Sequence, residues 1–488
     1  MEALKQLIGQ DWVPAASNEN LDDINPATEE VIATVPRSRA EDVDRAVTAA
    51  WEAYRQAWGR MDASERGRLL YKLADLVERD AAIIGRMDSE DMGKPLADAT
   101  GCVGGAAGEL RYYAGLTDKI EGKLLDTPEG YFGYTLREPY GVVAAIIPWN
   151  FPINQITVKV APALAAGNAV ILKPSDVSPR SALHFGKLAL EAGLPPGTLN
   201  VLTGHGEEMG TALVQHPGVA RLTFTGSCAT GRKILQGSAS NFKKLTLELG
   251  GKTANVIMPD ANMEAAVSWA ARTAFLNTGQ ICTTGSRLLL HKSIKKEFLA
   301  ALIERTKKIT VGDPRDPKTA LGPLCSKDQY EKVGRYLDIA RKEKMEFLTG
   351  QENPVTNRFK KGYYMVPTIL DAVPRTSSVA RDEIFGPVLS VFTFSSEEEA
   401  IEIANDTNTG LAADLWSTDF ATVHRMAARL EAGIIWVNCS NVVCPWMPYG
   451  GQKTSGSGFE SGPENIIEFT KLKTVVSNLT GQAIGWPS

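Results

Sequence analysis

The sequence predicts an α/β fold in which helices cover both faces of parallel sheets. From about residue 140, short apolar runs alternate with stretches of helical periodicity, and unbroken apolar runs are typical of strands buried on both faces. Two helical stretches end at Gly167 and Gly193, shortly before the next apolar run, which is a common helix stop. The apolar runs of this first unit are 141–148, 168–175, 199–204, 221–227 and 244–251.

The N-terminal third is predicted to be helical. In EDVDRAVTAAWEAY, the residues Val43, Val47, Ala50 and Tyr54 fall on one face at 3.6-residue spacing, and RLLYKLADLVERDAAII repeats that pattern. The simplest interpretation is amphipathic helices that pack against the core.

A second α/β unit is predicted from about residue 251. It contains the apolar runs ANVIMP, SRLLLHKS, GPVLSVFTF and GIIWVNCSN and the helical stretch IKKEFLAALIERTKKI. Two segments fit neither unit: 130–141 is predicted to be a β-hairpin, and IEFTKLKTVVSNL alternates like a strand. A strand far from any core of its own suggests an exposed edge that another subunit completes.

Composition limits the function. A chain of 488 residues is expected to form two or three domains, and 43% apolar with 22% charged residues is ordinary for a globular protein. The net charge is −5 and there is no basic run of the kind that follows phosphate backbones. The first residues, MEALKQLIGQDW, lack the apolar core of a signal peptide. We therefore expect a soluble cytoplasmic protein with neither nucleic acid nor membrane as a partner.

The cysteines and histidines do not indicate a metal site. Disulfide frameworks belong to short secreted chains, so we expect reduced thiols. Cys439 and Cys444 have no second cysteine pair or clustered histidines to complete a zinc set. The six cysteines are irregularly spaced, at positions 102, 228, 282, 325, 439 and 444, and the five histidines are scattered, at 184, 205, 216, 291 and 424.

Polar side chains lie where the apolar runs of the first unit end. Parallel sheets bind ligands at the carboxyl ends of their strands, and Asn150, Lys173, Ser227 and Glu248 fall there. The segment GHGEEMG is one residue too long for the dinucleotide fingerprint, so a tight turn is an equal interpretation.

Two of these segments suit a nucleotide. In FTGSCATG, Gly226 and Ser227 lie where a strand turns into a helix, so backbone N–H groups and the helix dipole can meet a phosphate. In LKPSD, Lys173 and Asp176 can both bond ribose hydroxyls. From LKPSD alone, however, a solvated surface pair is the better interpretation.

A cysteine stands among small, uncharged residues in GQICTTGSR, at position 282. A buried cysteine is most often a small hydrophobe, and a metal ligand or a nucleophile is the alternative. This stretch alone does not choose among them.

An ordered set of motifs resembles the NAD(P)-dependent aldehyde dehydrogenase superfamily over essentially the whole chain. The motifs are PWNFP, LKPSD, FTGS, LELGGK, GQIC, EIFGPV and PYGGQKTSG, and GQICTTGSRL is most similar to the betaine-aldehyde and aminoaldehyde branch. The resemblance implies a Rossmann-like cofactor domain, an α/β catalytic domain and a small β oligomerisation arm, assembled as a homodimer or homotetramer. The implied boundaries are 1–122 with 141–250, then 251–450, and 123–140 with 451–488.

The resemblance also implies a mechanism. Cys282 is the nucleophile that forms a thiohemiacetal and then a thioester, and the side chain of Asn150 with the Cys282 backbone N–H stabilises the oxyanion. Glu248 is the general base that activates water. A carboxylate at the end of an apolar strand should have a raised pKa, which suits proton abstraction. Lys159 and Glu460 match positions of a proton relay.

NAD is the implied cofactor. Asp176 replaces the glutamate of most NAD-preferring relatives. It keeps the negative charge that disfavours a 2′-phosphate, but it is one methylene shorter, so some NADP use is compatible with it. The implied cofactor residues are Trp149, Lys173, Asp176, Gly226, Ser227, Leu249 and Glu383, with Phe385 near the nicotinamide ribose.

The substrate is less closely defined. Phe151 and Tyr449 match two aromatic positions that surround an ammonium group in the aminoaldehyde branch. Val158, however, stands where that branch carries tryptophan, and 101–108 is uncharged where it carries carboxylates. A bulky apolar or aromatic aldehyde is favoured, with Trp446 either a further wall of the tunnel or a core residue. Betaine aldehyde or an ω-aminoaldehyde is the alternative, and a catalytically idle binding protein or a cysteine hydrolase represents another class.

Overall fold

The first sheet is built from the apolar runs that follow residue 140, and it confirms the α/β prediction. The computed structural model describes residues 2–351 and 359–482. Five parallel strands lie in the order β12-β11-β8-β9-β10. Their bounds are β8 (Val142–Ile146), β9 (Ala169–Lys173), β10 (Leu199–Val201), β11 (Arg221–Thr225) and β12 (Lys244–Glu248).

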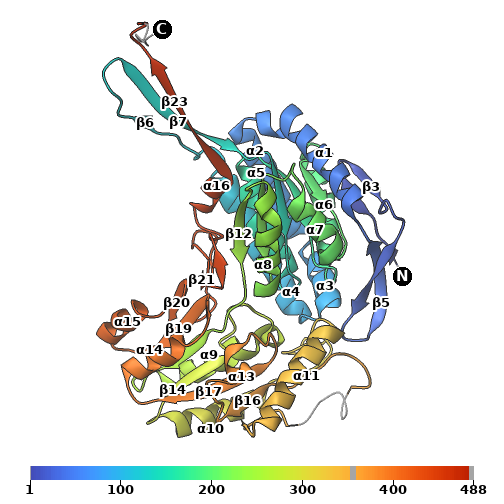
Figure 1. Cartoon of the computed structure of the whole chain (residues 1–488). Coiled ribbons are helices and arrows are strands. Elements are labelled where there is room, and N and C mark those ends of the chain that lie inside the picture. The colour runs from blue at the N-terminus through green and yellow to red at the C-terminus, as the bar shows by residue number, and fades with distance from the viewer. Residues whose placement is uncertain (1, 352–358, 483–488) are drawn as a thin grey trace.

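Helices cover both faces of this sheet (Figure 1). Val143 and Val170 pack with α2, α4, α5 and α6, whereas their neighbours Val142 and Ala169 pack with α1, α7 and α8. Because successive strand residues face opposite sides, burial on both sides produces unbroken apolar runs. The helices are α1 (Ala40–Gln56), α2 (Ala63–Arg79), α3 (Ala81–Met92), α4 (Leu96–Ala114), α5 (Pro152–Ala165), α6 (Arg180–Ala192), α7 (Thr211–Gln215) and α8 (Cys228–Gly237).

The N-terminal third is not helical throughout. Short strands precede α1, and β2 pairs antiparallel with β10 to extend the first sheet. Strands of two or three residues carry too little periodicity to be recognised, and they exist because a neighbouring strand completes their hydrogen bonds. The strands of two or three residues are β1 (Glu2–Ala3), β2 (Gln6–Ile8) and β3 (Asp11–Val13), and the longer β4 (Asn20–Asn25) and β5 (Glu30–Pro36) pair with each other.

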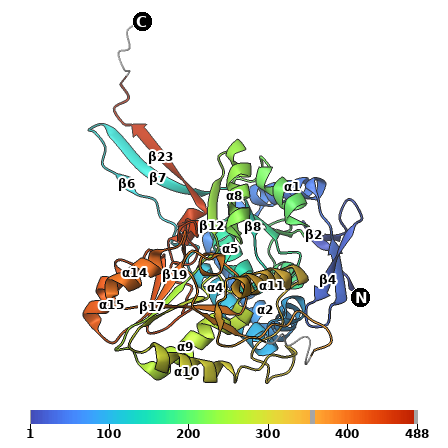
Figure 2. The same ribbon diagram turned by 60° about the horizontal axis from the view of Figure 1, so that its bottom comes forward.

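The second sheet has the order β15-β16-β17-β14-β13-β19-β20, parallel except for β15. Figure 2 shows it beside the first sheet, with its own helices. Its strands are β13 (Ala254–Ile257), β14 (Arg287–His291), β15 (Glu346–Phe347), β16 (Thr368–Asp371), β17 (Val388–Phe394), β19 (Ala412–Trp416) and β20 (Ile434–Val437). Its helices are α9 (Met263–Phe275), α10 (Lys295–Thr306), α11 (Lys327–Lys342), α13 (Ser378–Arg381), α14 (Glu397–Asn405) and α15 (Phe420–Ala427).

A three-stranded antiparallel arm projects from the body of the protein (Figure 1). Its strands are β6 (Leu124–Leu125), β7 (Tyr131–Pro139) and β23 (Thr470–Asn478). The predicted hairpin within 130–141 is wrong, because this segment is one continuous strand between β6 and β23. Gly133 makes no turn. It lets β7 pass close to Thr127, whose methyl group would lie 2.7 Å from a Cβ at that position.

The remaining elements connect the arm to the two sheets. β22 pairs with β12 in the first sheet, whereas the predicted boundary assigned residues 451–488 to the arm. The domain boundaries stay a prediction. Within residues 2–351 and 359–482, no helix is both long and apolar enough to cross a bilayer. These elements are β18 (Thr409–Gly410), β21 (Gln452–Lys453), β22 (Gly456–Ser457) and α16 (Asn465–Glu468).

Candidate active site

Glu248 is the last residue of β12, at the carboxyl end of the first sheet. Its side chain is buried, with the residue only 3% exposed, and neither carboxylate oxygen has a hydrogen-bond partner among the described residues. Burial raises the pKa of Glu248 well above its ordinary value, the charge of Glu460 raises it further, and Lys159 lowers it. A carboxyl that is costly to ionise binds a proton readily once it is ionised, so this group is suited to act as a base.

The nucleophile loop, residues 276–286, turns sharply between α9 and β14. Asn277, Thr278 and Gly279 have φ values of 52°, 57° and 71°, a left-handed conformation that non-glycine residues rarely adopt. A Cβ on Gly279 would lie 2.2 Å from the Gly386 carbonyl oxygen. Only glycine fits there, which explains the glycine directly before Gln280 and Ile281.

Asn150 is bound to this loop from both sides. Its amide Nδ2 donates to the Gln280 carbonyl at 3.0 Å, and the Asn277 amide donates to the Asn150 carbonyl at 3.1 Å. Asn150 therefore lies beside the Gln280 backbone, two residues before Cys282. An oxyanion that forms on a carbonyl carbon next to Cys282 needs a hydrogen-bond donor there.

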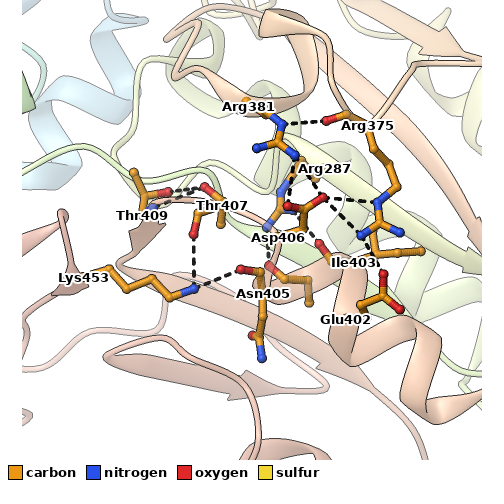
Figure 3. Close-up of polar contacts among 11 residues, drawn as sticks. Arg287, Arg375, Arg381, Glu402, Ile403, Asn405, Asp406, Thr407, Thr409 and Lys453 are labelled. Atoms are coloured by element: carbon orange, nitrogen blue, oxygen red, sulfur yellow. Dashed lines mark hydrogen bonds and ion pairs between the residues drawn. The ribbon is translucent and has the colours of Figure 1, made fainter.

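The downstream end of the loop is fixed by Arg287, the first residue of β14. Its buried guanidinium donates to the carbonyl oxygens of Ile403 at 2.8 Å and Ala404 at 2.6 Å, at the end of α14 (Figure 3). A third bond, of 2.9 Å, reaches the Lys252 carbonyl. A cation at a helix C-terminus is favourable because it completes the free carbonyl groups there.

A buried polar network supports the loop from the second sheet. Thr283 donates to the Asn441 side chain, and the Gly285 N–H donates to the Thr273 hydroxyl at 3.3 Å. The Thr273 hydroxyl lies 2.9 Å from that of Ser440. Burial raises the pKa of Asp414 to about 8, while the hydroxyls of Ser440 and Thr273 lower it. The sequence analysis missed Asp414, because an aspartate within an apolar strand carries no motif.

Cys282 contacts a single polar side chain among the described residues. Its Sγ lies 3.1 Å from the Tyr449 hydroxyl. Burial raises the pKa of the Cys282 thiol to about 12, the Tyr449 contact lowers it, and the charges of Glu383 and Glu248 raise it. The sequence analysis assigned Tyr449 only to the substrate tunnel and did not predict its contact with the Cys282 sulfur.

Tyr449 links the nucleophile to the predicted relay. Its backbone N–H and C=O pair with those of Glu460, with two hydrogen bonds of 2.7 Å. The Glu460 carboxylate accepts from Lys159 and, at 3.1 Å, from Thr223. A further carboxyl follows on α4, where Glu109 accepts from Ser461 at 3.2 Å and burial raises its pKa to about 7. Glu109 is a second residue that no motif revealed.

Glu383, Phe385 and Trp149 are three of the residues predicted to bind the cofactor. Glu383 accepts from the Gly251 N–H at 3.2 Å. Burial raises its pKa to about 7, against the opposing effects of Lys332, the Gly251 N–H and Lys252. The rings of Trp149 and Phe385 meet edge to face, with centroids 5.3 Å apart.

Lys173 and Asp176 follow β9. Lys173 is buried and donates to the Pro174 carbonyl at 2.9 Å, and burial lowers its pKa. The Asp176 carboxylate lies 2.8 Å from Nδ1 of His205, and its side chain is 38% exposed. An exposed carboxylate fits a ribose, whose hydroxyls can donate to it.

The start of α8 fits a pyrophosphate. Ser227 is the N-cap of this helix and accepts from the Thr230 N–H at 3.1 Å, and no acidic residue lies in the first turn. Gly226 precedes the helix, and Leu249 packs against Gly231 within it. A helix N-terminus without acidic side chains favours an anion.

The predicted tunnel residues come from two segments, α5 with its N-cap and the loop that contains Trp446 and Tyr449. Phe151 is the N-cap of α5, and the Lys94 ammonium lies 3.4 Å from the centroid of its ring. Val158 lies half-buried on the same helix. Trp446 is 59% exposed, and its ring centroid is 6.5 Å from that of Tyr112. The alternative that Trp446 is a core residue is therefore wrong.

The geometry can support covalent catalysis followed by hydrolysis. The Asn150 side-chain amide is bonded to the backbone two residues before Cys282, and the charge of the buried Glu248 raises the pKa of the Cys282 thiol. A carbonyl group next to Cys282 would meet all three functions needed for acyl transfer.

Comparisons with known proteins agree with the geometry. The model of the family described as aldehyde dehydrogenase matches residues 12–475. Human retinal dehydrogenase 2 is 41% identical over 475 residues, covering 96% of this chain and 91% of that protein. Peroxisomal aminoaldehyde dehydrogenase 2 of Pisum sativum is 41% identical over 487 residues, covering 98% and 96%.

A solved structure has the same fold over nearly the whole chain. The betaine aldehyde dehydrogenase of Staphylococcus aureus in complex with NAD+ superimposes with a TM-score of 0.97 at 36% identity. The match covers 99% of this chain and 97% of that one.

Proposed function

The chain belongs to the aldehyde dehydrogenase family, and from this premise we propose that it oxidises a bulky apolar or aromatic aldehyde to the acid with NAD. One observation carries the proposal: the buried Glu248 carboxyl, at the carboxyl end of a parallel sheet and without a hydrogen-bond partner among the described residues, lies close enough to Cys282 for its charge to raise the pKa of that thiol. NAD accepts a hydride when it is bound, which is the oxidation step that these side chains cannot supply themselves.

Acylation begins when Cys282 loses its proton. Glu248 is the acceptor, and the sulfur then attacks the aldehyde carbon to form a thiohemiacetal whose oxyanion faces Asn150 and the Cys282 N–H. Departure of a hydride from that carbon leaves the Cys282 thioester.

Deacylation uses Glu248 again. After the proton taken from Cys282 has left Glu248 through Lys159 and Glu460, the ionised carboxylate takes a proton from water, the hydroxide attacks the thioester carbon, and the acid leaves as the sulfur regains its electron pair. Lys159 and Glu460 then carry the proton away from Glu248, and the contact between them supports this role.

The coenzyme would occupy the carboxyl ends of β9 and β11. Ser227 and Gly226 would hold the pyrophosphate, Lys173 and Asp176 the adenine-side ribose, and Glu383 the nicotinamide-side ribose. The negative charge of Asp176 favours NAD over NADP.

Uncharged walls support the apolar substrate. The Asn154 side chain donates to the Cys102 carbonyl at 3.0 Å, so the uncharged stretch 101–108 lies against α5, which carries Val158. The exposed Trp446 ring adds apolar surface. Betaine aldehyde or an ω-aminoaldehyde is the second candidate, favoured by the similarity to the Pisum and Staphylococcus enzymes.

An aldehyde panel separates these candidates. Wild-type enzyme is assayed for NADH and NADPH formation with aromatic, long-chain aliphatic, betaine and ω-amino aldehydes. We expect the highest kcat/KM with the first two groups and with NAD. Val158→Trp should raise kcat/KM for betaine aldehyde, whereas the control Val158→Leu should not. A wild-type preference for the cationic aldehydes would overturn the substrate proposal.

The arm supports a homodimer or homotetramer. β23 pairs with β7 on one side only, and Leu472 and Val476 are exposed on it. An open strand edge with apolar side chains is suited to pairing with a second copy, which light scattering would detect. The six cysteines are unpaired, which supports a reducing compartment such as the cytoplasm.

A further inference from the structure

We propose that the Tyr449 hydroxyl is a further catalytic group, which stabilises the Cys282 thiolate by donating a hydrogen bond to its sulfur. The inference rests on the proposed function, in which that sulfur is the nucleophile. It gives Tyr449 a chemical role in addition to its position in the predicted tunnel.

The surroundings of Cys282 oppose the thiolate. Burial disfavours the charged sulfur, and the nearby carboxyls of Glu383 and Glu248 act in the same direction. Within the described residues, no lysine, arginine or histidine makes a hydrogen bond to this sulfur, and the contact of 3.1 Å with Tyr449 is its one side-chain hydrogen bond. A thiolate in a poorly solvated place needs a donor.

The direction of this hydrogen bond follows from the chemistry of the two groups. A neutral thiol can donate or accept, but a thiolate has no proton, so Tyr449 must be the donor once Cys282 is ionised. Burial raises the pKa of Tyr449 well above its ordinary value, and the charges of Cys282 and Glu248 raise it further. The phenol therefore keeps its proton while the thiol loses one.

Thr283 competes for the same phenol. Its hydroxyl also lies against Tyr449, and its own proton is directed to the Asn441 side chain, so its oxygen is a neutral acceptor. A charged sulfur is the stronger acceptor, so the phenol proton is directed to the sulfur once the thiolate forms.

The donor is held in place before the reaction. The Tyr449 backbone is paired with Glu460 by two hydrogen bonds of 2.7 Å, and the Glu460 side chain is bonded to Lys159 and Thr223. A fixed dipole needs little reorganisation when charge develops on the sulfur. The proton lost by Cys282 goes to Glu248, and the phenol proton remains on its oxygen.

Tyr449→Phe tests the inference, because it removes the hydroxyl and keeps the ring. Wild type and variant, without coenzyme, react with iodoacetamide from pH 7 to 9.5, and mass spectrometry follows the peptide that contains Cys282. The alkylation rate should fall roughly 10-fold or more at every pH, because a hydrogen bond to a charged group is lost. Tyr71→Phe, which removes an exposed phenol on α2, is the matched control and should react like wild type.

Two further measurements separate the outcomes. Melting temperature and NAD binding should match wild type in both variants, so that slower alkylation reports the sulfur and not the fold. Equal alkylation rates in Tyr449→Phe and wild type would overturn this inference and leave the proposed function intact. If wild-type enzyme forms no NADH with any aldehyde of the panel, the proposed function fails, whatever the alkylation rates are.

Discussion

The coenzyme side and the nucleophile side of the site are held in different ways. On the coenzyme side, meaning the residues predicted to hold the pyrophosphate and the adenine-side ribose, Ser227 bonds to a neighbour three residues away and Asp176 is partly exposed. On the nucleophile side, Asn150 bonds to Gln280 and Cys282 to Tyr449, 130 and 167 residues apart in sequence.

This difference predicts how each side responds to substitution. Exposed groups with local contacts interact with a ligand through solvent-screened charge, so changing one of them alters affinity modestly. Buried groups that depend on one another have strongly shifted pKa values, so changing one alters the chemistry of the others. The predictions below test that contrast, from the largest expected effect to the smallest.

Cys282→Ala should lower aldehyde oxidation by roughly 10⁴-fold or more, because no other group can form the adduct. NAD affinity, measured by fluorescence titration, should stay within about twofold of wild type. Oxidation at an appreciable rate would refute the nucleophile assignment. A large loss of NAD affinity would instead show that the two sides are not independent.

Glu248→Gln should slow thioester hydrolysis by about 10²- to 10³-fold, because the buried base is lost. Stopped-flow measurement should still detect a burst of NADH, slower than in wild type because Glu248 also accepts the Cys282 proton, since hydrolysis is slowed more than acylation. If the burst disappears and hydrolysis is unaffected, Glu248 acts only in acylation.

Asp176→Asn should reduce the preference for NAD over NADP by roughly 10-fold, because a partly exposed charge no longer repels the 2′-phosphate. The dissociation constants of both coenzymes provide the measurement. Glu207→Gln, which neutralises an exposed carboxylate nearby, should change the ratio less. A change in the rate of thioester hydrolysis in Asp176→Asn would contradict the proposed separation of the two sides.

Glu460→Gln should move the acidic limb of thioester hydrolysis to lower pH. The negative charge of Glu460 raises the pKa of Glu248, so removing that charge lowers this pKa and the ionised base persists at lower pH. The ratio of single-turnover hydrolysis rates at pH 6 and pH 9 should rise a few-fold. Glu460→Asp keeps the charge and should leave the ratio near wild type, and a fall in the ratio for Glu460→Gln would reverse the assigned sign.

Much of the fold could be predicted because its strands are buried on both faces. The run that became β8 is apolar throughout and β9 is apolar up to Lys173, and burial on both faces selects that composition. The strand β2 and the continuous β7 could not be predicted, because their partners β10 and β23 are distant in sequence. The β7 segment contains Gly133, which resembles a turn until the close approach of Thr127 explains it.

The sequence by itself determined which side chains lie at the ends of strands, because the point at which each apolar run stops sets the positions of Lys173, Ser227 and Glu248. Only the tertiary structure decided that Tyr449 meets the Cys282 sulfur and that Asp414 and Glu109 are buried beside the site. The physical reason is that strand ends follow from local burial patterns. Contacts over more than a hundred residues depend on how two sheets and a C-terminal segment pack, and no local pattern encodes that.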